Sequence, residues 1–218
     1  MKDALNAGDH VRAVIRNTGI NQDGKTSGIA LPSQVAQQAL ANHVFKQVGL
    51  DPCKINYVEA HGTGTIAGDL AETKSIANVF CTERKKTLYI GSIKSNIGHL
   101  ESASGAAGLL KAILVLEKGL IPPHVNLSNH KKGLDLEQSN IVVPSKIEKL
   151  SVDEDGKSRI AINSFGYGGT NAHAILETAP LVSTSSDFVG RFSLTNSLLP
   201  LEALSEQISK LGSQGSMA

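Results

Sequence analysis

The chain has 218 residues, enough for one large domain or two small ones that bury roughly 70% of the unfolded surface. Its 21 basic and 20 acidic residues leave a formal net charge of +1, so bulk charge directs it neither to nucleic acid nor to a membrane surface. Aromatic residues make up only 4% and tryptophan is absent, which argues against a base-stacking platform. Any partner must therefore be recognised locally.

The cysteines and the apolar segments indicate the compartment. Cys53 and Cys81 fit neither a disulfide framework nor a metal-ligand pattern, which indicates a reducing environment. The first residues lack the basic and apolar regions of a signal peptide. The longest apolar run, residues 109–116, contains a lysine and is too short to cross a bilayer. These features predict a soluble, cytoplasmic protein.

The N-terminal third begins with a strand and a helix. Residues 11–16 alternate apolar and polar side chains and predict a strand, and the glycine-containing residues 17–32 predict a long loop. Ser33 can cap a helix that stops before Gly49.

Two predicted strands then lead to histidines. Residues 55–60 form a strand that ends at His61, and a helix over residues 69–80 follows. Residues 87–93 form a second strand, which leads through a short polar segment to His99. Each histidine therefore lies in a glycine-bearing turn after a strand.

The remaining elements complete an α/β pattern. Residues 103–118 predict a helix that is apolar nearly all round, which indicates burial, and its first turns hold small residues. Two strands, residues 159–163 and 172–177, flank the glycine-rich residues 166–171. Alternating strands and helices predict an α/β layered fold with a largely parallel sheet and an antiparallel pair at its end.

The histidines are the candidate catalytic residues. Ligands in open α/β sheets bind at the carboxyl ends of the strands, so His61, His99 and residues 163–171 should meet at one crevice. Two neutral imidazoles there could stabilise an enolate or an oxyanion, and Lys94 could keep one of them neutral by repulsion. The alternative is that each histidine is a hydrogen-bonded structural residue.

Other readings of these motifs are weaker. Asp69 and Glu72 have the spacing of a helix capping box, which competes with a role as catalytic carboxylates. The glycines of residues 166–169 precede a strand, so they do not form a dinucleotide-binding loop. The histidines lack metal-ligand spacing, so no metal site is expected.

Three motifs together resemble the β-ketoacyl synthase family. They are HGTGT with a following Asp and Glu (residues 61–72), KSNIGHLE (residues 94–101) and NSFGYGGTNAH (residues 163–173). The chain is similar to the carboxyl-terminal portion of the ketosynthase domain of type I polyketide synthases, with features of the fungal reducing kind. The resemblance covers residues 1–178, and residues 179–218 resemble a linker-like tail with a short amphipathic helix.

The resemblance implies a fold and a reaction. The family fold is a thiolase-like α-β-α-β-α sandwich, of which this chain would be the carboxyl-terminal half plus the last strand of the first half. Such a half would leave an apolar face of its central helix layer uncovered, and residues 11–16 would be an unpaired edge. The family joins an acyl chain to a malonyl unit by decarboxylative Claisen condensation. The malonyl unit is carried on the phosphopantetheine of an acyl carrier protein, and no other cofactor is implied.

The resemblance also implies residue roles. His61 and His99 match the two histidines that bind the malonyl thioester and promote decarboxylation. Lys94 matches the lysine that supports the second histidine, and Glu72 matches a carboxylate that steadies that lysine. The backbone N–H of Phe165 matches an oxyanion-hole donor, and its ring matches a gate to the acyl pocket.

The family's nucleophilic cysteine is the point of departure. It belongs before the stretch that resembles residues 1–16, and neither Cys53 nor Cys81 matches it, although the basic neighbours of Cys81 could lower its thiol pKa. The first expectation is therefore a ketosynthase fragment that is inactive alone. The alternatives are a non-catalytic partner that completes or regulates another synthase chain, and a malonyl-thioester decarboxylase that uses only the histidines. The resemblance also allows a homodimer or pairing with a complementing ketosynthase half.

Overall fold

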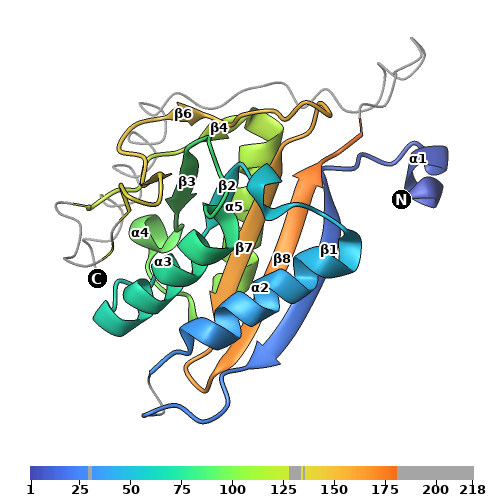
Figure 1. Ribbon diagram of the computed structural model, residues 1–218. Coiled ribbons are helices and arrows are strands. Elements are labelled where there is room, and N and C mark those ends of the chain that lie inside the picture. The colour runs from blue at the N-terminus through green and yellow to red at the C-terminus, as the bar shows by residue number, and fades with distance from the viewer. Residues whose placement is uncertain (29–30, 128–133, 135, 181–218) are drawn as a thin grey trace, which may run out of the picture. The chain divides into compact units, whose positions relative to one another are not determined.

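A six-stranded mixed sheet lies at the centre of the described residues, which are 1–28, 31–127, 134 and 136–180 of the computed structural model (Figure 1). The strands, in their order across the sheet, are β1 (Ala13–Gln22), β8 (Thr170–Thr178), β7 (Arg159–Phe165), β2 (Tyr57–Glu59), β3 (Leu88–Gly91) and β5 (Ile141–Val142). Strands β7, β2, β3 and β5 are parallel, and β8 runs antiparallel to both β7 and β1. This agrees with the predicted parallel sheet that ends in an antiparallel pair.

Strand β1 is longer than the sequence predicted. It continues to Gln22 through residues predicted as a loop, because β8 pairs with it along this length. Its polar side chains find partners on both sides: Asn21 donates its amide to the carbonyl of Ala36 at 2.7 Å and accepts from Asn171 at 3.1 Å. The strand lies at the edge of the sheet, with β8 on one side and no strand among the described residues on the other, as the resemblance implies.

Three long helices cover the sheet. Helices α2 and α3 lie together on one face, and α5 lies on the other (Figure 1). Their bounds are α2 (Gln34–Val48), α3 (Ile66–Phe80) and α5 (Ser104–Lys118). The Ser33 hydroxyl accepts the N–H of Ala36 at 3.1 Å, and Gly49 and Gly119 end α2 and α5 in the left-handed conformation, as the capping pattern predicts.

Short elements connect these layers. They are α1 (Lys2–Ala7), the 3₁₀ turns η1 (Pro52–Lys54) and η2 (Glu101–Ala103), α4 (Lys94–Ile97), and the strand pair β4 (Leu120–Ile121) with β6 (Glu148–Lys149). The sequence patterns did not predict them, because elements of two to six residues are too short to show a period.

Two apolar clusters fill the space on either side of the sheet. The first lies between the sheet and the α2–α3 layer and includes Val44, Phe45 and Phe80, none more than 2% exposed. The second lies under α5 and includes Val115 and Ile160. Because both faces of the sheet are covered, the central strands are apolar in both directions, as is typical of parallel sheets.

Helix α5 is buried on one side only. Its inward residues include Ala112, Val115 and Leu116, whereas Leu110 is 57% and Leu114 is 48% exposed. The prediction of burial all round is therefore wrong, because the sheet reaches only one side of the helix. The uncovered apolar side is what the resemblance to half of a layered fold implies.

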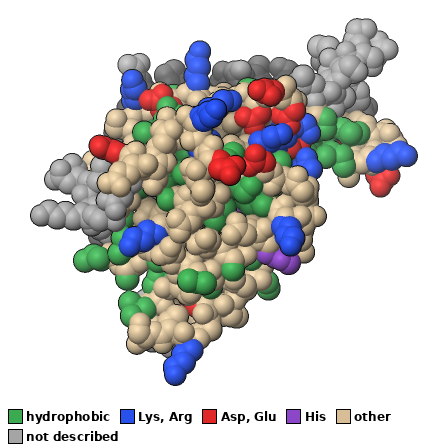
Figure 2. Space-filling view, in the orientation of Figure 1, with side chains coloured by type: hydrophobic (Ala, Val, Ile, Leu, Met, Phe, Trp, Pro, Cys, Tyr) green, Lys and Arg blue, Asp and Glu red, His purple; other side chains and the backbone are tan. Residues whose placement is uncertain are grey.

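Charges of both signs share the surface. Figure 2 shows basic and acidic side chains next to one another on the face seen in Figure 1, without a broad area of one sign. Near the start of β7, the carboxylate of Glu177 pairs with Arg16, Lys157 and Arg159, at 3.0, 2.5 and 2.8 Å. No helix among the described residues is long and apolar enough to cross a membrane. The predicted tail helix lies in residues 181–218, outside the described part of the chain.

Candidate active site

The loop that carries His61 is held by one buried carboxylate. Strand β2 ends at Glu59, and the chain turns immediately. The backbone N–H of His61 donates to Oε1 of Glu72 at 2.8 Å, and that of Gly62 donates to Oε2 at 2.9 Å. Glu72 comes from α3 and is only 4% exposed. The Glu72 carboxylate thus fixes the backbone at His61 and Gly62.

Glu72 is not part of a capping box. The helix cap is Thr65, whose hydroxyl accepts the N–H of Gly68 at 3.2 Å, while Asp69 accepts the N–H of Gly64 at 3.1 Å. The capping-box interpretation therefore fails for Glu72, because α3 begins three residues earlier than the sequence suggested and places this carboxylate in its second turn, facing the sheet.

A buried polar chain runs from Glu72 into the core. The Asn163 amide donates to Oε1 of Glu72 at 2.9 Å, and its carbonyl oxygen is 2.8 Å from Nδ1 of His173. Since the amide nitrogen of Asn163 faces the carboxylate, its oxygen must accept, so His173 carries its proton on Nδ1. Burial raises the pKa of Glu72, an effect opposed by its three N–H donors and by the charge of Lys94.

The imidazole of His61 is neutral and has a defined tautomer. Its Nδ1 accepts the backbone N–H of Phe165 at 3.3 Å, so its proton lies on Nε2. Burial, together with the charges of Lys94 and His99, lowers the pKa of His61 to about 4. At neutral pH its Nε2 is therefore an uncharged hydrogen-bond donor.

His99 has the same tautomer. Its Nδ1 accepts the backbone N–H of Glu101 at 2.9 Å, which leaves the proton on Nε2. Glu101 holds a φ of 50°, which is rare for a residue with a side chain and lets the backbone turn back towards the ring. The rings of His61 and His99 meet edge to face with centroids 5.5 Å apart. The structure thus brings together the two histidines singled out by the sequence.

Lys94 is half-buried in the segment between β3 and His99. It opens the short helix α4, and burial lowers its pKa while the charges of Glu72 and Glu59 raise it. Its own positive charge contributes to the lowered pKa of His61. It is not among the described residues that line the cleft next to the histidines, so its effect there is electrostatic.

Phe165 closes one side of His61. It ends β7, and its ring centroid lies 5.6 Å from that of His61. Its N–H, the expected oxyanion-hole donor, points at Nδ1 of His61 in this structure. The aromatic ring and the two histidines therefore form one cluster.

The cluster opens into a cleft of about 960 Å³. Its walls come from the loops after β1, β2 and β7, from η2 and from the first turn of α5. Its lining includes His61, Thr63, His99, Phe165 and Tyr167. The Tyr167 side chain is exposed at the cleft and was not singled out from the sequence, although it lies in the same glycine-rich motif.

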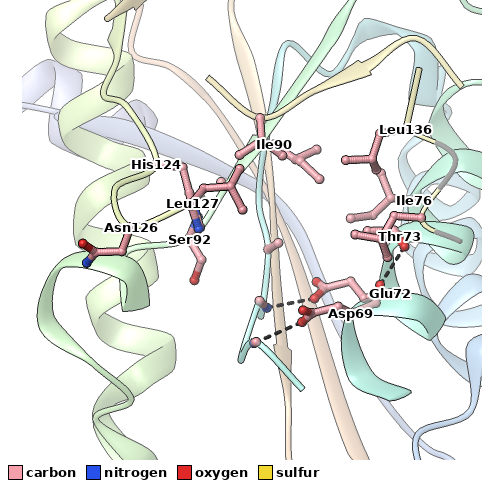
Figure 3. Close-up of a pocket in the computed structure, with 16 residues that line it drawn as sticks. Asp69, Glu72, Thr73, Ile76, Ile90, Ser92, His124, Asn126, Leu127 and Leu136 are labelled. Atoms are coloured by element: carbon pink, nitrogen blue, oxygen red, sulfur yellow. Dashed lines mark hydrogen bonds between the residues drawn. The ribbon is translucent and has the colours of Figure 1, made fainter. Parts of the chain in front are cut away.

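A second, smaller cavity of about 320 Å³ lies on the other side of Glu72 (Figure 3). Figure 3 shows Asp69 and Glu72 at its floor and His124 with Ser92 on the opposite wall. Nδ1 of His124 accepts the N–H of Ser92 at 3.3 Å, so this histidine is held by the backbone. Neither His61 nor His99 lines this cavity.

Neither cysteine belongs to the cleft. Cys53 lies in η1, where Arg84 binds its carbonyl oxygen at 3.0 Å, and burial raises its pKa. Burial also raises the pKa of Cys81 to about 11, although Arg84 opposes the effect. The idea that basic neighbours activate Cys81 is therefore wrong, because desolvation outweighs them. Within the described residues, no group of three or more His, Cys, Asp or Glu side chains could hold a metal ion.

Comparison with known proteins agrees with this geometry. A family model described as "Beta-ketoacyl synthase, C-terminal domain" matches residues 12–128, more than half of the chain. The chain belongs to this family. The match includes both histidines of the cleft.

Similar proteins narrow the family. The chain is 56% identical over 182 residues to the highly reducing polyketide synthase sdnO of Sordaria araneosa and 52% identical over 180 residues to the highly reducing polyketide synthase AFT9-1 of Alternaria alternata. Each match covers 83% of this chain but 6% of the synthase. This β-ketoacyl synthase chain therefore corresponds to a small part of such proteins, the carboxyl-terminal portion of a ketosynthase domain of the reducing type.

Solved structures confirm the thiolase-like fold class. The ketosynthase from module 6 of the bacillaene synthase of Bacillus subtilis 168 superposes with a TM-score of 0.79 at 38% identity, over 83% of this chain and 33% of that one. Ketosynthase twelve of the bacillaene polyketide synthase of Bacillus amyloliquefaciens gives a TM-score of 0.77 at 37% identity, over 82% and 32%. The chain thus spans about a third of a solved ketosynthase.

Proposed function

We propose that the cleft binds the malonyl thioester of a polyketide extender unit and promotes its decarboxylation, as one half of a condensing site. One observation carries the proposal. In both His61 and His99, Nδ1 accepts a backbone N–H. Each ring therefore offers an uncharged Nε2–H donor to a ligand. Two such donors match an oxygen on which negative charge develops.

The chemistry follows from these donors. In a malonyl thioester, the bond to the carboxylate breaks, CO₂ leaves, and the electron pair forms an enolate on the thioester oxygen. The Nε2–H groups of His61 and His99 donate to that oxygen and stabilise the enolate relative to the ground state. Burial, together with the charges of Lys94 and His99, keeps His61 from gaining a second proton at neutral pH, so Nδ1 still accepts the Phe165 N–H and Nε2–H remains the donor.

The carrier and the second reactant follow from the same proposal. The malonyl unit arrives on the phosphopantetheine of an acyl carrier protein. Condensation also needs a nucleophile that carries the acyl chain, and neither cysteine lines the cleft, so this group comes from a part of a synthase other than the described residues. The unpaired side of β1 suits pairing with a second copy or with a complementing half.

The test uses the full chain and malonyl-N-acetylcysteamine labelled with ¹³C in its free carboxyl group. We expect release of ¹³CO₂ above a heat-denatured control, with a loss of about 10²-fold or more in His61→Ala and in His99→Ala. His43→Ala, at an exposed position on α2, is the matched control and should keep the rate. Cys53→Ser and Cys81→Ser should keep it as well.

Two results would contradict the proposal. One is a chain that neither releases ¹³CO₂ nor shifts the histidine ring signals in NMR when the thioester is added. The other is full decarboxylation in His61→Ala. Formation of a β-ketoacyl thioester that disappears in Cys53→Ser or Cys81→Ser would instead show that a cysteine of this chain is the nucleophile.

A further inference from the structure

A buried ion pair behind the catalytic loops has no part in the proposed chemistry. Glu59 is 1% exposed, and its Oε2 lies 2.8 Å from Nζ of Lys111, a side chain that is 10% exposed. The Tyr57 hydroxyl donates to the same oxygen at 2.8 Å. Burial and the negative charge of Glu59 raise the pKa of Tyr57 well above its usual value, so the phenol stays a donor. Oε2 of Glu59 therefore has two specific partners, Lys111 and Tyr57.

The other oxygen of Glu59 reaches a different loop. Oε1 accepts the backbone N–H of Ile93 at 2.6 Å, a short bond of the kind that an ionised acceptor makes. Ile93 is the residue immediately before Lys94 and caps α4. The carboxylate thus binds the junction through which β3 leads to the segment with Lys94 and His99.

Glu59 also connects this junction to the other histidine. It lies two residues before His61 in β2, and Lys111 lies in α5, the helix that follows His99. A Cβ added at Gly108 would lie 3.3 Å from Cγ of Glu59, so α5 packs directly against this side chain. One carboxylate therefore contacts the strand before the first histidine, the junction before the lysine and the helix after the second histidine.

We propose that Glu59 is a positioning residue that holds the loop with Lys94 and His99 in register with the loop of His61, with Lys111 as its buried counter-ion. The inference rests on the proposed function of the two histidines. A positioning role for Glu59 differs from a role in stability alone. A buried ion pair that serves only stability can often be replaced by apolar residues without loss of folding free energy. Here the carboxylate binds a catalytic loop through its backbone, and an apolar side chain could not accept that N–H.

The charge of Glu59 gives the proposal a specific signature. The charged and titratable groups that interact with Lys94 are Glu72 from α3, Glu59 from β2 and His61. Burial lowers the pKa of Lys94, and the two carboxylates oppose this effect. Removing the charge at Glu59 should therefore lower the pKa of Lys94 further, which a packing defect elsewhere would not do.

The experiment compares Glu59→Gln with Glu177→Gln in the full chain. Glu177 is also a buried, ion-paired carboxylate, 2% exposed, but it lies on β8 at the Arg159 end of β7. NMR measures the pKa of Lys94 from its ε-methylene signals and the position of the Ile93 amide proton. In Glu59→Gln we expect a lower pKa for Lys94 and an upfield shift of the Ile93 amide, because a neutral carbonyl is the weaker acceptor. Glu177→Gln should lower the midpoint of thermal unfolding and change neither signal.

Further variants separate charge, reach and stability. Tyr57→Phe and Lys111→Met each remove one partner of Oε2 but leave the Glu59 carboxylate in place. Both variants should therefore retain the wild-type position of the Ile93 amide. Glu59→Asp keeps the charge but is one methylene shorter, so the Ile93 bond should be lost while the pKa of Lys94 stays close to that of the wild type. Glu59→Gln leaves Lys111 without its counter-ion and should therefore lower the midpoint of thermal unfolding. The double variant Glu59→Gln/Lys111→Met removes that lysine as well, so it should regain the midpoint without regaining the wild-type position of the Ile93 amide.

Turnover provides a separate readout. Where the chain decarboxylates the malonyl thioester, Glu59→Gln should lower kcat by about tenfold and leave KM within about twofold, because loop position affects the transition state more than binding. A wild-type chain without turnover contradicts the proposed function, but the NMR comparison still tests Glu59. The inference is overturned if the Ile93 amide and the pKa of Lys94 in Glu59→Gln equal those of the wild type, or if Glu177→Gln shifts them as much.

Discussion

Two glycines in the His61 loop have similar backbone angles but different surroundings. Gly62 has a φ of 49° and Gly64 a φ of 78°. A Cβ at Gly62 would lie 2.9 Å from Cβ of Ser92, whereas nothing lies within 4 Å of one at Gly64. Both glycines therefore meet the need for positive φ, and only Gly62 also meets a need for space next to β3.

This difference predicts unequal effects of alanine. Gly62→Ala and Gly64→Ala should each cost about 1–2 kcal/mol of unfolding free energy for the left-handed backbone. Gly62→Ala should cost about 1–3 kcal/mol more, because the Ser92 contact forces the loop to move. Urea unfolding of the two variants measures both effects. Equal losses would show that the contact with Ser92 relaxes without strain.

The site was predictable from sequence where its residues lie in short motifs. His61 and His99 each follow a strand, so the sheet rule was enough to place them at the same crevice, and the rings do meet. The resemblance gave Glu72 a supporting role beside Lys94, but its hydrogen bonds to the His61 loop were not predicted, because its spacing from Asp69 is also that of a capping box. The chain from Glu72 to Asn163 and His173 links residues 91 and 10 positions apart, and no local pattern reports such contacts.

At the scale of elements, the ends of the strands and the buried sides of the helices depended on tertiary contacts that the local sequence does not specify. Strand β1 extends to Gln22 because β8 offers a partner along its whole length, although residues 17–22 have the polar composition of a loop. Helix α5 has no polar face in sequence, so its periodicity could not show which side contacts the sheet. The capping residues Ser33 and Gly49, in contrast, were correct, since caps are local hydrogen bonds.

The two sides of α5 allow a direct test with one residue type. Leu116 is 6% exposed and packs in the cluster under the helix, whereas Leu114 is 48% exposed. Leu116→Ala should lower the unfolding free energy by about 2–5 kcal/mol, because it leaves a cavity. Leu114→Ala should change it by less than about 1 kcal/mol, because alanine has the higher helix propensity and little area is lost.

Denaturant unfolding of the two variants decides between one buried side and two. A large loss in Leu114→Ala would mean that this side of α5 is covered in solution, for instance by self-association. Sedimentation of the wild type and the variant at several concentrations would then show whether a second copy is the cover.

At the scale of the whole molecule, most of the perturbed groups make the fold weaker in acid. His61 and His173 have a pKa of about 4 in the folded chain, below the usual value of 6.5. As the pH falls, the unfolded chain binds protons at these histidines before the folded chain does. Their contribution to stability is therefore complete above pH 6.5 and falls as the pH drops towards 4.

The carboxylates add to this pH dependence. Salt bridges lower the pKa of Asp155, and the salt bridges of Glu177 outweigh its burial, so its pKa is lowered as well. Both carboxylates therefore act in the same direction, since they lose their contribution below their unfolded values. Burial raises the pKa of Glu72, which acts in the opposite direction.

His173 should supply much of this acid sensitivity. It is 3% exposed, its ring centroid lies 5.9 Å from that of Phe45 and 6.3 Å from that of Phe80, and its Nε2 is buried without a hydrogen-bond partner among the described residues. A proton on that nitrogen would be a buried charge, so the unfolding free energy should fall by up to about 1.4 kcal/mol for each pH unit between 6.5 and 4 through this one group.

The variant His173→Gln removes the titration but keeps an amide that can donate to Asn163. Its unfolding free energy, measured by urea denaturation at pH 4.5, 5.5 and 7, should depend less steeply on pH than that of the wild type. Phe45→Leu, next to the same ring, is the control: it should lower stability at every pH and keep the wild-type slope, since it changes packing and not protonation. If His173→Gln keeps the full slope, the acid sensitivity belongs to other groups, and burial does not lower the pKa of His173 in the folded chain.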